Sequence, residues 1–72
     1  MNEVELRVRP AAVGWGIDSS LTFEPVYFES GGRAELTARS LAIRLANAGV
    51  PVRLFVSDRA NQVVAIHRYF AD

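Results

Sequence analysis

His67 is the only histidine in the chain, so any acid–base or metal chemistry that uses an imidazole depends on this residue. A metal site needs several nitrogen, sulfur or carboxylate ligands at suitable spacing, and His67 lies beside Arg68 with no acidic neighbour. The chain has no cysteine, which excludes thiolate ligands and thiol nucleophiles. Glu24 and Glu29 have the wrong spacing for a catalytic carboxylate pair. We therefore expect a protein that is not an enzyme and that has no catalytic residue, metal or cofactor.

A second kind of chemistry is anion binding at the start of a helix. The sequence Ser30-Gly31-Gly32-Arg33 offers free backbone amides and an arginine at a predicted helix N-terminus, where anions bind. It lacks the Gly-Lys-Ser/Thr ending of a phosphate-binding P-loop. We interpret Ser30 as an N-cap and keep Ser30, Gly31, Gly32 and Arg33 as a minor candidate anion site.

A third possibility is stacking of single-stranded bases on a sheet. We expect Arg53, Phe55, His67 and Tyr69 to share the sheet face that no helix covers, and arginine with aromatic residues on a sheet can stack bases. However, eight acidic residues balance eight basic ones, so the formal net charge is zero and a nucleic-acid partner is disfavoured. Burial of this face in a homodimer is our preferred interpretation, and a single-stranded nucleic-acid-binding module is the alternative.

These side chains must be positioned by a helix and by the strands around it. The helix is predicted between Ser30 and Gly49, where Ser-Gly-Gly starts it and Gly49-Val50-Pro51 stops it. Its core-facing stripe follows helical spacing. The predicted members of this stripe are Ala34, Ala38, Leu41, Leu45 and Ala48.

The remaining residues alternate between apolar and polar side chains, which predicts strands. The predicted strands cover residues 3–9, 13–17, 21–28, 50–57 and 62–70, with a bulge at Pro25 that keeps Leu21, Phe23, Val26 and Phe28 on the core face. In the last strand we place Val64 and Ile66 on one face and Val63, Ala65, His67 and Tyr69 on the other. Asn61 suits a left-handed hairpin position.

The fold class is α+β, a single domain over residues 1–72. Its order is β-β-β-α-β-β, with one mostly antiparallel sheet and a single helix packed on one face.

One helix leaves apolar residues without cover on so small a chain. Leu36 and Ile43 lie opposite the alanine stripe, and Phe55 and Tyr69 lie on the open sheet face. The candidate partner interface is therefore Leu36, Ile43, Phe55, His67 and Tyr69. A homodimer is the simplest partner, and another protein partner remains an alternative. No apolar run has the length of a membrane span, and the N-terminus does not resemble a signal peptide, so we expect a cytoplasmic interaction module without catalytic activity.

Several landmarks together also match a known family. They are Val8-x-Pro10, Gly14-Trp15, Pro25-x-x-Phe28, the alanine-rich helix with Ala34, Ala38, Leu41 and Ala42, Val52 to Val56, Asp58-Arg59 and Tyr69. Over residues 6–70 the chain resembles the small bacterial domains of unknown function in the DUF class numbered twenty-one eighty-eight. The family usually has Asp-Gly at the last turn, where this chain has Arg59-Ala60-Asn61. The resemblance implies this same fold and no particular activity.

Overall fold

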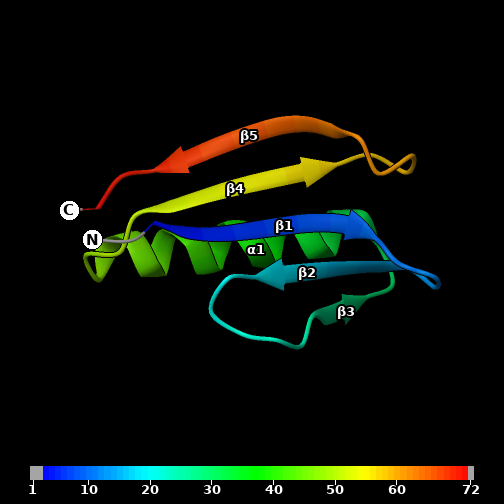
Figure 1. The fold of residues 1–72 in the computed structure, drawn as a ribbon, viewed down its shortest axis with the longest axis horizontal. Helices are drawn as coiled ribbons and strands as arrows, with labels where there is room; N and C mark the ends of the chain where they lie inside the picture. Colours follow the sequence, from blue (N-terminus) through cyan, green and yellow to red (C-terminus); the bar gives the residue numbers. More distant parts are fainter. Residues whose placement is uncertain (1–2, 72) are drawn as a thin grey trace.

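Residues 3–71, the part that the computed structural model describes, form one five-stranded sheet with one helix across one face (Figure 1). The elements are β1 (Val4–Pro10), β2 (Trp15–Ser19), β3 (Val26–Phe28), α1 (Gly31–Asn47), β4 (Val52–Ser57) and β5 (Val63–Tyr69). The predicted α+β class and the predicted order of elements are confirmed.

The sheet has the strand order β3-β2-β1-β4-β5, so β3 and β5 are its edges. The central pair β1 and β4 is parallel, because α1 carries the chain back across the sheet before β4 begins. The pairs β1–β2, β2–β3 and β4–β5 are antiparallel. The expectation of a mostly antiparallel sheet is therefore confirmed.

The core lies between α1 and the two central strands. Leu6 pairs with Leu54 across the parallel ladder, and both side chains are fully buried under the helix. Val8 and Val52 are the other two large side chains in the described residues that are less than 2% exposed. The core residues of β1 alternate with charged residues, and in the described residues no layer covers the sheet face opposite α1.

Helix α1 begins where the sequence predicts. The Oγ atom of Ser30 accepts a hydrogen bond from the backbone N–H of Arg33 at 3.1 Å, which makes Ser30 the N-cap. The buried stripe follows every fourth residue: Ala34, Ala38, Ala42 and Ala46. The predicted stripe was therefore wrong at Ala48, which is exposed, and Leu41 and Leu45 are half-buried beside the stripe. Small side chains face the sheet because the helix axis lies close to it, and the leucines pack along the sides.

The second and third strands are shorter than predicted. Val13 lies outside β2, and β3 begins only after Pro25, so the predicted bulge there is absent. Leu21 and Phe23, which we expected in the core, are exposed in the β2–β3 loop. Local bonds hold this loop away from a strand conformation: the Leu21 amide donates to Ser19 Oγ, and the Thr22 hydroxyl donates to a backbone carbonyl two residues later.

The last hairpin corrects a prediction about faces. Asn61 has a φ of 60°, as the sequence predicts. However, His67 pairs with the buried Leu54, and Tyr69 pairs with the buried Val52. His67 and Tyr69 therefore lie on the helix side, and the prediction that they share the open face with Phe55 was wrong. The register between β4 and β5 decides the face, and it shifts by one residue at a bulge after Val56.

Candidate interaction surfaces

The sheet face that points away from α1, here called the open face, carries an array of opposite charges. In Figure 1 the helix lies behind the strands, so the open face is toward the viewer. Its arginines are Arg7, Arg9, Arg53 and Arg68, and its carboxylates are Glu3, Glu5 and Asp18. Four positive and three negative groups leave this face with a net charge of +1.

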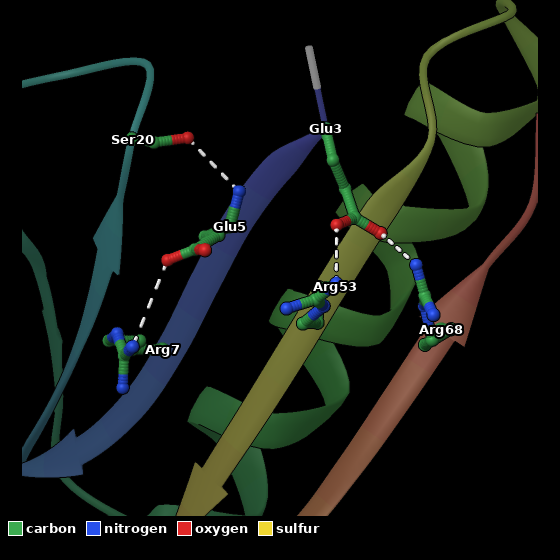
Figure 2. Close-up of polar contacts among 6 residues, drawn as sticks. All are labelled: Glu3, Glu5, Arg7, Ser20, Arg53 and Arg68. Carbon is green, nitrogen blue, oxygen red and sulfur yellow. Dashed lines mark hydrogen bonds and ion pairs between the residues drawn. The ribbon is translucent and has the colours of Figure 1, made fainter.

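Glu3 joins two arginines that would otherwise repel each other. Arg53 and Arg68 are directly paired across β4 and β5. The two oxygens of Glu3 lie 3.0 Å from Arg53 Nη2 and 3.3 Å from Arg68 Nη2, as Figure 2 shows. A carboxylate between two neighbouring cations offsets the cost of placing like charges opposite each other. This arrangement stabilises the register of three adjacent strands.

Arg9 and Asp18 form a two-bond ion pair between β1 and β2. Nε and Nη2 of Arg9 donate to the two carboxylate oxygens of Asp18 at 2.6 and 2.9 Å. The hydrogen bonds from Arg9 hold the pKa of Asp18 below its ordinary value, and Asp18 in turn raises the pKa of Arg9. Gly16 leaves room between the side chains of Arg9 and Tyr27 on the same face.

Phe55 lies on the open face as predicted, but its ring is covered. The guanidinium carbon of Arg7 lies 4.2 Å from the centre of the Phe55 ring, within the range of a cation–π contact. Arg7 also pairs with Glu5 at 3.8 Å, and the backbone N–H of Glu5 donates to Ser20 Oγ at 3.0 Å (Figure 2). The flat side of Phe55 is thus occupied by a residue of the same chain.

The outer edge of β5, here called the β5 edge, is the longest uncovered strand edge in the described residues. β5 has β4 as its only neighbour, so the backbone groups on its other side have no ladder partner. The β5 edge carries exposed apolar side chains, with Val64 63% and Ile66 56% exposed. Arg68 is its one charged residue. We missed Val64 and Ile66 as surface residues because apolar side chains occur at both parities of this strand.

His67 and Tyr69 lie near the helix instead of on the open face. Nη2 of Arg39 lies 3.1 Å from Nε2 of His67. A guanidinium only donates, so Nε2 of His67 is the acceptor in this contact. Arg39 also pairs with Glu35 one turn earlier at 2.8 Å, and this hydrogen bond raises the pKa of Arg39. The small cluster of Glu35, Arg39 and His67 attaches α1 to β5.

The candidate anion site is a helix start already occupied by its own cap. Ser30 Oγ is bonded to the Arg33 amide, and a Cβ on Gly31 would lie 2.9 Å from the Trp15 ring, so Gly31 packs against the indole. Gly32 and Arg33 are exposed. The observed contacts explain Ser30 and Gly31 by capping and packing, and they give no evidence of a ligand.

Two further apolar groups are exposed. Leu36 and Ile43 lie on the outer side of α1, where the sequence places them. The second group is in the β2–β3 loop and β3, and sequence analysis assigned most of it to the core. Its members are Leu21, Phe23, Val26 and Tyr27.

Metal and membrane features are absent from the part of the chain that the structure describes. Residues 3–71 contain no group of three or more histidine, cysteine, aspartate or glutamate side chains that could hold a metal ion. Among these residues, no helix combines the length and the apolar character needed to cross a bilayer.

Comparisons with known proteins give no relative from which a function could be transferred. No protein-family model matches the chain, and neither a curated protein nor a solved structure matches it. The functional argument therefore depends on the surfaces described above.

Proposed function

We propose that this domain is a small interaction module that forms a homodimer through the β5 edge. The observation that carries this proposal is an uncovered seven-residue edge strand with exposed apolar side chains and one charge. Such an edge is a template for pairing with another strand, and soluble proteins usually block it.

The two edges of the sheet differ in how they are protected. β3 has only three residues and follows Pro25, which cannot donate to a ladder. β5 is more than twice as long and contains no proline, glycine or lysine. The β5 edge has one charge and the bulge at Val64, but it is the longer and less protected of the two edges, and this difference favours it as the site of association.

The small core supplies a thermodynamic reason for association. Four alanines form the buried side of α1, and among residues 3–71 only four large side chains are fully buried. A domain of this size gains limited stability from its own core and often gains more by oligomerising. Pairing at the β5 edge would satisfy free backbone groups and would cover Val64 and Ile66. We place this dimer in the cytoplasm.

The alternative of single-stranded nucleic acid has less support. Each arginine of the open face is paired with a carboxylate, and His67 and Tyr69 lie on the other side of the sheet. The aromatic side chains that remain for stacking are Phe55, which Arg7 covers, the exposed Tyr27, and the exposed Phe70, whose ring centre lies 5.7 Å from the guanidinium carbon of Arg68. No observation favours this function over the dimer.

Sedimentation velocity with matched variants tests the proposal. The wild-type protein should sediment as about 16 kDa at micromolar concentration, twice the chain mass of 7.9 kDa. Ile66→Lys adds a charge at the β5 edge and should give a monomer. Leu36→Lys adds the same charge at the exposed apolar position on α1 and should stay dimeric. A wild-type protein that is monomeric at millimolar concentration would refute the proposal, and dissociation by Leu36→Lys alone would move the interface to the helix.

A further inference from the structure

The strand that forms the β5 edge has a midpoint at Ile66, which lies three residues from each end of Val63–Tyr69. When two identical strands pair antiparallel about a two-fold axis, residues at equal distances from the axis lie opposite each other. Placing the axis at Ile66 keeps all seven residues within the paired segment, and the bulge at Val64 then lies opposite the partner's Arg68. Moving it by one residue to either side leaves five of them paired.

We propose, on the basis of the proposed dimer, that two copies of this chain pair along β5 with the two-fold axis at Ile66. This register fixes every cross-strand neighbour. On the open face Ile66 meets the partner's Ile66, and Val64 meets the partner's Arg68. On the helix side Ala65 meets the partner's His67, and Val63, which lies beyond the bulge, is opposite the partner's Tyr69.

The side chains favour this register over its neighbours. Arg68 is the one charged residue of the strand, and in this register it lies opposite a valine, so no like charges face each other. An axis at His67 would place the two imidazoles opposite each other. On the helix side, the Ile66 axis places the two large residues His67 and Tyr69 opposite the smaller Ala65 and Val63, which leaves room for both rings.

The consequence is one continuous sheet with both helices on the same side. Two five-stranded sheets would join into a sheet of ten strands, because residues opposite each other in an antiparallel pair point to the same face. Figure 1 shows that α1 lies behind the central strands and leaves the outer side of β5 clear for a second strand. The open faces of the two copies would then form a single surface, with Ile66 of both copies at its centre.

Engineered cysteines can measure the register directly, since the chain has no cysteine of its own. Ile66→Cys should form a disulfide-linked dimer under mild oxidation, because the two sulfur atoms meet at the axis. Val64→Cys is a control on the same face with similar exposure. Its two cysteines would be separated by about 13 Å along the strand, beyond the reach of a disulfide. We expect Ile66→Cys to give at least about tenfold more cross-linked dimer than Val64→Cys on a non-reducing gel.

A mixed experiment covers the case in which Ile66→Cys itself weakens association. Val64→Cys and Arg68→Cys proteins, mixed and oxidised, should cross-link to each other and not to themselves. If the wild-type protein is a dimer but Val64→Cys cross-links to itself, or if the Val64→Cys and Arg68→Cys proteins do not cross-link to each other, the register is overturned and the dimer remains. A wild-type monomer in sedimentation would instead remove the dimer on which the register depends.

Discussion

Gly31 and Trp15 touch so closely that position 31 has no room for a side chain. A Cβ built on Gly31 would lie 2.9 Å from Cε2 of the Trp15 indole, shorter than real Cβ contacts. A Cβ on the next residue, Gly32, would have no other atom within 4 Å. The indole is a rigid ring that is partly buried against the core, so it cannot yield as a flexible chain end would. Two adjacent glycines of one helical turn therefore have different roles.

The first prediction compares these two glycines. Gly31→Ala should destabilise the protein, because overpacking costs about 1–3 kcal/mol and the helix propensity of alanine returns at most about 1 kcal/mol. Gly32→Ala should be neutral or stabilising by up to about 1 kcal/mol for the same propensity reason. Urea unfolding of both variants measures the difference. Equal stability of the two variants would show that Trp15 does not limit this position.

The second prediction concerns Arg9 and Asp18. Because the folded protein lowers the pKa of Asp18, the pair stabilises the fold above the ordinary pKa of 3.8. That stability is lost as the pH falls through the lower folded pKa. Asp18→Asn should therefore reduce the dependence of the free energy of unfolding on pH below about 5. Arg9→Gln should reduce it to a similar extent, since the guanidinium is the cause. An unchanged acid slope in both variants would contradict the role of this pair.

The third prediction concerns the contact of α1 with the sheet. Ala38 is fully buried in the stripe, so Ala38→Leu should cost about 1–3 kcal/mol by pushing the helix away from the strands. Ser40→Leu introduces the same side chain at an exposed position of the same helix and should change stability by less than about 0.5 kcal/mol. Thermal or urea unfolding measures both. A tolerated leucine at position 38 would mean that the helix lies further from the sheet.

The elements with strong local signals could be predicted from the sequence. Strict alternation defines β1, and capping by Ser30 with the stop near Gly49 defines α1. Asn61 was predicted in a left-handed conformation because its side chain tolerates positive φ. In each case the information lies within a few residues of the feature.

The faces of β5 could not be predicted in the same way. Val63 and Val64 are both apolar, and each parity of the strand contains apolar and polar residues, so the local pattern does not select a face. The face is set by the pairing of His67 with Leu54, a contact between strands. Phe23 misled the prediction for the opposite reason: its spacing from Leu21 fits a strand, but the hydrogen bonds of the loop keep both side chains in solvent. The β5 edge could therefore be recognised as a candidate surface only once the pairing register of β4 and β5 was known.

The last prediction concerns single-stranded nucleic acid. Arg7 covers the ring of Phe55 at 4.2 Å, and the open face has a net charge of only +1, so neither base stacking nor phosphate binding is well supported. Mixed-sequence single-stranded DNA and RNA oligonucleotides should show no association by fluorescence anisotropy at low salt and protein concentrations up to about 100 μM, where nonspecific binding is normally seen. A low-micromolar affinity would contradict this expectation if it weakened with added salt and if Phe55→Ala reduced it by about 1–3 kcal/mol, because those two signs together indicate stacking on the sheet. In that case the arginine pairs of the open face would have to open when the strand binds, and Arg7 would have to leave the Phe55 ring.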